Sequence, residues 1–157
     1  MGVGRSFAEA YHKAVIATGE SIPTSGKAFL SVRDVDKVEL IGVAKDLIAL
    51  GYSLVATRGT AIAIREAGME VDHINKVLEG RPHIVDMLKN GEVDLIVNTT
   101  EGKQAIADSA TIRRTALQNK VYYNTTISGA RASCMALRSG ESHAVYRLQE
   151  LHTELAG

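Results

Sequence analysis

Polar side chains follow each apolar segment that predicts a buried strand, and their types favour the binding of a phosphorylated ligand. Hydroxyls, amides, lysines and glycines are groups that can surround a phosphate and a sugar. These positions do not join a nucleophile to a histidine base, the pairing on which acyl transfer depends. The pattern therefore indicates anion binding rather than bond making. The strings are Ser31–Lys37, Thr57–Thr60, Asn75–Lys76, Asn98–Gly102 and Tyr123–Thr126.

One of these strings, Thr57–Thr60, lies at a predicted junction between a strand and a helix. Free amide groups and the positive end of a helix attract phosphate. Gly59 lets the backbone approach closely because it has no side chain in the way, and Thr57 and Thr60 can add hydroxyl donors. Lys37 can supply a positive charge from the start of the preceding helix. An ordinary tight helix start and a solvated lysine would use the same residues, so the string alone does not define a site.

The residues after the predicted strand Leu95–Asn98 allow two interpretations. Asn98, Thr99 and Thr100 can face a ligand at the end of the strand, or they can cap the helix that begins near Lys103. Carboxylates close to them more often cap helices or hold a ribose hydroxyl than act as acids or bases. These carboxylates are Asp94, Glu101 and Asp108.

Metal and disulfide chemistry are disfavoured by the composition. Cys134 is the only cysteine, which excludes an internal disulfide and suits a reducing cytoplasm. The histidines lack the spacing of a zinc motif and are not paired with cysteine, so we expect no metal. They are His12, His73, His83, His143 and His152.

Net charge and hydropathy disfavour nucleic-acid and membrane partners. The 18 basic and 18 acidic residues cancel, so any anion site must be local. No apolar run approaches the roughly 20 residues of a membrane-spanning helix. We therefore expect a protein that stays soluble in the cytoplasm and binds neither nucleic acid nor membrane.

The elements that must position these residues alternate along the chain. The predicted strands are continuously apolar, which calls for a parallel sheet covered on both faces. We therefore predict a three-layer α/β/α fold with a mainly parallel central sheet, in which ligands collect outside the carboxyl ends of the strands. Strands are expected at 28–32, 52–57, 71–74, 95–98 and 121–124. Helices are expected at 7–15, 38–50, 61–67, 82–88, 103–117, 127–137 and 142–155, with a linker at 18–26.

Taken together, five strings resemble the C-terminal regulatory domain of the carbamoyl phosphate synthetase large subunit. The similarity runs from about Gly2 to the end of the chain, and the string at 75–83 is its most specific part. This resemblance implies the fold of methylglyoxal synthase. It also implies that residues 1–26 are a helix and linker from the preceding domain and that 27–157 are the regulatory domain. The strings are Ser31–Lys37, Ala56–Ala61, Asn75–Ile84, Asn98–Gly102 and Asp108–Arg114.

The resemblance implies an allosteric role within an ATP-dependent ligase, with no catalysis and no cofactor in this domain. Uridine monophosphate would inhibit and inosine monophosphate would activate carbamoyl phosphate synthesis for pyrimidine and arginine biosynthesis; the sequence leaves open which is the physiological effector. The partners would be the rest of the large subunit and its glutaminase small subunit. The implied phosphate ligands are Lys37, Thr57, Gly59 and Thr60. The implied ribose and base ligands are Lys76, Asn98, Thr100 and Asp108.

One departure from the family concerns its ornithine site. Family members bind ornithine through a Tyr-Asp-Thr string, which here is Tyr123-Asn124-Thr125. A neutral amide cannot attract the ammonium group of ornithine as a carboxylate would. We therefore expect only a remnant of that site.

The sequence leaves three alternatives open. A methylglyoxal synthase acting on dihydroxyacetone phosphate needs a carboxylate base in a Gly-Gly-Asp string, where this chain has Arg81 within Glu79–Pro82, and a guanidinium cannot accept the proton. The inosine-monophosphate cyclohydrolase domain shares the Ser-Val and Thr-x-Gly-Thr strings but lacks the segment at 75–83. A docking module without a ligand would be excluded by saturable nucleotide binding.

Overall fold

A five-stranded parallel sheet forms the centre of the molecule, and its strands run in the order β3-β2-β1-β4-β5. The computed structural model describes residues 1–101, 103–140 and 144–156. The chain builds outward from β1 to β3, then returns to add β4 and β5 on the other side. This reversal creates a switch point between β1 and β4. The strands are β1 Gly26–Ser31, β2 Tyr52–Ala56, β3 Asp72–His73, β4 Leu95–Asn98 and β5 Tyr122–Asn124.

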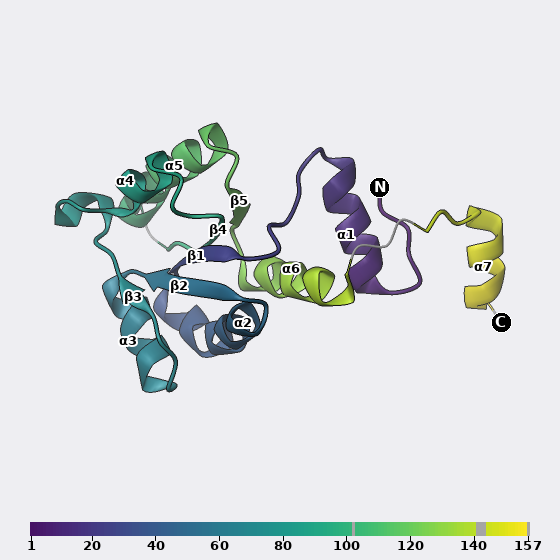
Figure 1. The fold of residues 1–157 in the computed structure, drawn as a ribbon, viewed down its shortest axis with the longest axis horizontal. Coiled ribbons are helices and arrows are strands. Elements are labelled where there is room, and N and C mark those ends of the chain that lie inside the picture. The colour runs from purple at the N-terminus through teal and green to yellow at the C-terminus, as the bar shows by residue number, and fades with distance from the viewer. Residues whose placement is uncertain (102, 141–143, 157) are drawn as a thin grey trace.

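Helices cover both faces of the sheet, which confirms the predicted three-layer α/β/α fold (Figure 1). Phe29 and Ile96 pack with α4 and α5 on one face, whereas Leu30 and Val97 pack with α2, α3 and α6 on the other. Successive side chains of a strand point to opposite faces, so the apolar runs Ala28–Leu30 of β1 and Leu95–Val97 of β4 fill both cores. The helices are α1 Phe7–Ala17, α2 Lys37–Ala49, α3 Arg58–Glu66, α4 Ile84–Lys89, α5 Lys103–Gln118, α6 Ile127–Ser139 and α7 Leu148–Ala156. Short 3-10 turns cover Asp34–Asp36 and Val77–Glu79.

The starts of α3 and α4 differ from the sequence prediction. We expected Pro82 in the first turn of a helix, but α4 begins at Ile84, because the Asp86 carboxylate accepts the backbone N–H of His83 at 3.2 Å and caps the helix there. The helix α3 begins earlier than expected, at Arg58, with Thr57 as its N-cap residue. The N-cap and first turn of α3 therefore contain the string Thr57–Thr60.

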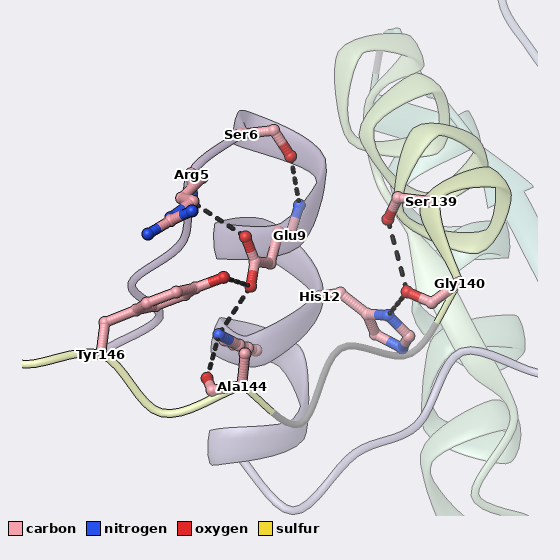
Figure 2. Close-up of polar contacts among 9 residues, drawn as sticks. Arg5, Ser6, Glu9, His12, Ser139, Gly140, Ala144 and Tyr146 are labelled. Atoms are coloured by element: carbon pink, nitrogen blue, oxygen red, sulfur yellow. Dashed lines mark hydrogen bonds and ion pairs between the residues drawn. The ribbon is translucent and has the colours of Figure 1, made fainter. Parts of the chain in front are cut away.

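The last helix is shorter than predicted, because residues 144–147 are not helical and α7 begins at Leu148; residues 142 and 143 of the expected helix lie outside the described residues. Contacts with α1 hold this segment, as Figure 2 shows. Lys13 Nζ donates to the Ala144 carbonyl at 2.7 Å and to Glu9 Oε1 at 2.8 Å. Tyr146 donates to the same Glu9 oxygen at 2.9 Å. Tertiary contacts of this kind override the helical spacing of the sequence.

The helix α1 packs against α6 and joins the body of the fold (Figure 1). His12 is buried and its Nδ1 lies 3.4 Å from the Gly140 carbonyl at the end of α6. Tyr11 and Val15 pack against the apolar core beneath α2 and α6. The segment before β1 therefore contributes to the same core as the sheet.

Candidate functional site

Hydroxyl groups link the carboxyl ends of β1 and β2. Thr57 and Thr60, at the start of α3, are only 3% and 1% exposed. Thr57 Oγ1 donates to Ser31 Oγ at 3.2 Å, and Thr60 Oγ1 accepts the backbone N–H of Val32 at 3.2 Å. These bonds fix the first turn of α3 against the end of β1. The two threonines of the predicted phosphate site are thus held in place by the sheet.

The ammonium of Lys37 stands over the first turn of α3. Lys37 is the first residue of α2, and its Nζ lies 3.2 Å from the position that a Cβ on Gly59 would occupy. The absence of a side chain at Gly59 therefore lets this ammonium approach the backbone of α3. Lysine charge and helix N-terminus act on the same point, which is an arrangement suited to a phosphate.

A carboxylate already lies against that ammonium. Asp34 Oδ1 is 2.7 Å from Lys37 Nζ, and the Asp34 side chain is 92% exposed. The Lys37 ammonium, and at longer range the charge of Lys76, hold the pKa of the Asp34 carboxyl below its ordinary value. Lys76, which follows β3, therefore lies close enough to act on the same edge of the sheet.

A second acidic residue next to the site is tied to other groups. Asp36 accepts hydrogen bonds from Arg33 Nε at 2.8 Å and from a terminal nitrogen of Arg33 at 3.3 Å. Arg33 and Thr99 hold the pKa of the Asp36 carboxyl below its ordinary value. The backbone N–H of Arg33 in turn donates to the Thr99 hydroxyl at 3.2 Å. This network joins the residues after β1 to those after β4.

Asn98, at the end of β4, cross-links β4 to β5 and α5. Its side-chain amide donates to Ser109 at 3.0 Å and to the Tyr123 hydroxyl at 2.7 Å. Asn98 is buried, so the amide is oriented by two fixed partners. Arg113 lies over the Tyr123 ring, with 5.6 Å between the guanidinium carbon and the ring centroid. Asn98 thus holds α5 and β5 against the end of β4, a role that the sequence patterns did not indicate.

The remaining ribose and base positions are less well defined. Thr100 is half-buried two residues beyond β4, and Lys76 is exposed beyond β3. The backbone N–H of Lys76 donates to Glu79 Oε2 at 2.9 Å, which orders the turn that carries it. The side chain of Asp108 lies outside the described residues.

A sequence profile of the MGS-like domain family matches residues 39–125. The chain belongs to the MGS-like domain family. Over 155 residues it is 59% identical to the carbamoyl phosphate synthase large chain of Pseudomonas putida and, equally, to that of Halomonas eurihalina. These alignments cover 99% and 97% of this chain but 14% of each relative, so the chain spans a small part of their length. The expected resemblance is confirmed.

A solved structure supports the fold of this MGS-like domain. The methylglyoxal synthase of Elizabethkingia anophelis superposes with a TM-score of 0.58 over 72% of this chain and 79% of that chain. The two sequences are 20% identical over the aligned part. A similarity of this kind establishes the shared architecture and leaves the chemistry to be argued from the residues.

A separate hollow of about 400 Å³ lies between α1 and the start of α6 in this MGS-like domain. It contains Tyr123, Asn124 and Thr125, the string expected to be an ornithine-site remnant. Asn124 is 5% exposed, and its Oδ1 accepts a hydrogen bond from Ser133 Oγ at 3.2 Å. Its Nδ2 has no hydrogen-bond partner among the described residues. Residue 124 therefore presents an amide donor to its surroundings where the family string has a carboxylate.

Arg81 stands where a methylglyoxal synthase is expected to have its carboxylate base. Arg81 is exposed and lies 3.6 Å from an Asp86 carboxylate oxygen. Among residues 1–101, 103–140 and 144–156, no group of three histidine, cysteine or acidic side chains is arranged to hold a metal. No helix within those ranges has the length and apolar character needed to cross a membrane.

The individual roles of Ser31 and Asp34 were not predicted, although both lie in the string Ser31–Lys37. Only the structure pairs Ser31 with Thr57 and Asp34 with Lys37. Their position was the available signal, because Ser31 is the last residue of β1 and Asp34 follows three residues later, at the end of the strand next to the switch point.

Proposed function

We propose that the carboxyl edge of the sheet is an allosteric site for nucleoside monophosphates. The observation that carries this proposal is the position of Lys37, whose Nζ lies 3.2 Å from where a Cβ on Gly59 would stand, at the first turn of α3. A phosphate there would accept hydrogen bonds from backbone N–H groups and from the Lys37 ammonium, and the positive end of the helix would stabilise its charge. The buried hydroxyls of Thr57 and Thr60 would orient it.

The ribose and base lie toward β4 in this proposal. Asn98 and Thr100 follow the strand that neighbours β1, and Ser31 is in register with Asn98. Lys76 approaches from the β3 side, and we assign Asp108 to the same region from the family resemblance. The phosphate supplies most of the affinity because it is the charged group. The base determines which of two conformational states of the larger protein the ligand prefers.

The larger protein is, in our proposal, a cytoplasmic glutamine-hydrolysing carbamoyl phosphate synthase. This domain binds uridine monophosphate as inhibitor or inosine monophosphate as activator and so regulates carbamoyl phosphate synthesis for pyrimidine and arginine biosynthesis. Residues 1–26 form the helix and linker that enter it from the preceding domain, and 27–157 form the regulatory domain. The rest of the large subunit and the glutaminase small subunit are its partners. The domain needs no cofactor and performs no catalysis.

Calorimetric titration of the chain with uridine, inosine, adenosine and guanosine monophosphates tests the proposal. Uridine and inosine monophosphates should each bind saturably at one site and compete with each other. The corresponding nucleosides, which lack the phosphate, should bind far more weakly. Failure of all four nucleotides to bind would contradict the proposed function and favour a docking module without a ligand.

A further inference from the structure

The Lys37 ammonium that we assign to the ligand phosphate is already contacted by a carboxylate of the same chain. Asp34 Oδ1 lies 2.7 Å from Lys37 Nζ. Asp34 begins the short 3-10 turn Asp34–Asp36 directly before α2, so the two side chains are three residues apart on adjoining helical turns. Carboxylate and phosphate oxygens are the same class of acceptor for an ammonium.

The two acidic residues of this turn differ in how firmly they are held. The Asp36 side chain is only 17% exposed and accepts hydrogen bonds from two nitrogens of Arg33. Asp34 is 92% exposed, and its carboxylate pairs with Lys37. Asp36 is therefore fixed, whereas Asp34 can rotate into solvent without leaving a buried group unpaired.

We propose that Asp34 is an internal competitor of the ligand phosphate, occupying Lys37 in the unliganded state and leaving it when the phosphate binds. This inference rests on the proposed function, because it concerns the same site. An ammonium has three donors, so geometry alone would let it hold both anions. A carboxylate and a phosphate that share one ammonium nevertheless repel each other, and the repulsion favours departure of the exposed Asp34 side chain.

The charge of Asp34 persists under ordinary conditions. Lys37 and Lys76 hold the pKa of its carboxyl below the ordinary value, so the group stays ionised throughout the neutral range. The competition is therefore present wherever the protein functions. It lowers the affinity for every ligand that carries a phosphate, and it does not discriminate between bases.

The test compares Asp34→Asn with the unchanged chain by titration with inorganic phosphate, uridine monophosphate and uridine. The variant should bind phosphate and uridine monophosphate up to about fivefold more tightly, the range expected for removal of an exposed ion pair next to the ligand. Binding of uridine should not change. Glu39→Gln is the matched control, because it removes one exposed carboxylate from the first turn of α2, where Glu39 pairs with Arg131 at 3.4 Å. It should leave all three affinities unaltered.

A double-mutant cycle identifies Lys37 as the group for which Asp34 competes. In a Lys37→Gln background, Asp34→Asn should lose most of its effect on phosphate binding. Equal or weaker binding by Asp34→Asn, in a chain that does bind uridine monophosphate, overturns the competitor role and leaves the proposed function intact. An equal gain with and without Lys37 overturns it too, because the effect is then general electrostatics. If neither the chain nor Asp34→Asn binds any phosphate, the proposed function fails and the competitor role fails with it.

Discussion

The Tyr146 hydroxyl donates a hydrogen bond of 2.9 Å to the Glu9 carboxylate, joining two residues that are 137 positions apart in the chain. The same carboxylate accepts the backbone N–H of Arg5 at 2.8 Å and pairs with Lys13 at 2.8 Å (Figure 2). The Glu9 side chain is only 11% exposed. A buried carboxylate with several donors therefore connects the beginning of the chain to its last segment.

Glu9→Gln should release that last segment while preserving the sheet. The neutral amide loses the charge-assisted bonds to Lys13 and Tyr146, and each loss weakens local docking by about 1–3 kcal/mol. Trypsin should then cleave after Arg147 many times faster, because cleavage tracks the population of the open segment. Glu154→Gln is the control, since the pair of Glu154 with Arg5 is half exposed and contributes little. Equal cleavage rates in Glu9→Gln and the unchanged chain would contradict the role of Glu9.

Lys37→Ala should weaken uridine and inosine monophosphates alike, by more than tenfold. Both ligands present the same phosphate, and a lost charge-assisted hydrogen bond corresponds to about 1.5–3 kcal/mol. Lys45→Ala is the matched control because Lys45 is exposed on the same helix, two turns away. Calorimetric titration of both variants measures the effect. Unaltered binding by Lys37→Ala would show that the phosphate lies elsewhere.

Gly59→Ala should weaken nucleotide binding without lowering the stability of the fold. The new Cβ would stand 3.2 Å from Lys37 Nζ, so the flexible lysine must move by a few tenths of an ångström away from the helix start. Alanine also fills the space into which the phosphate must come. Stability should be equal or higher, by up to about 1 kcal/mol, because alanine favours a helix more than glycine does.

The measurement for Gly59→Ala is a urea titration together with nucleotide binding. Gly42→Ala is the control, because Gly42 lies in α2 with open space around its Cβ position. It should gain similar stability and keep full affinity. Strong binding by Gly59→Ala would remove Gly59 from the site.

The sequence predicted the centre of this fold better than its edges. The strand Leu95–Asn98 was placed correctly because three consecutive branched apolar residues between polar segments allow few other interpretations. The predicted start of α7 was wrong because Glu9 and Lys13 bind residues 144 and 146. Contacts between residues so far apart in the chain leave no local sequence pattern. Types and positions along the chain also indicated which residues surround the Gly59 turn. They did not indicate which groups pair there, so the contact between Asp34 and Lys37 needed the structure.

Cys134 should be unreactive in the native protein. Burial on α6 raises the pKa of its thiol to about 11, whereas an unfolded thiol ionises near 8.5. The thiolate is the reactive form, so a disulfide reagent at pH 8 should modify Cys134 much more slowly in buffer than in concentrated urea. Rapid modification of the folded chain would contradict the buried position.

The same shift predicts the sign of a pH effect on stability. A group whose folded pKa is raised contributes stability that is fully present below its unfolded pKa and is lost as the pH rises through the folded value. The contribution of Cys134 should therefore decline between about 8.5 and 11. Cys134→Ala should reduce this decline in urea titrations across that pH range. An unchanged pH dependence would assign the decline to other groups, such as Tyr52, whose pKa burial raises to about 12.

Asn124→Asp should restore ornithine binding to the hollow between α1 and α6. The present amide offers no charge to an ammonium group. A carboxylate at this 95%-buried position would attract the ornithine ammonium strongly, because without it the buried charge has no cationic partner. Ser133 already donates to the Asn124 oxygen at 3.2 Å and would hold the new carboxylate in the same orientation.

The variant should pay for this buried charge with lower stability in the absence of ligand, and ornithine should recover the loss. Norvaline, which has the same carbon chain without the terminal ammonium, is the control ligand and should not stabilise it. Thermal unfolding with and without each amino acid measures both effects. Equal stabilisation by ornithine and norvaline would show that the charge of residue 124 does not select the ligand. Stabilisation of the unchanged chain by ornithine would show that the amide of Asn124 is sufficient, because binding then survives without the carboxylate.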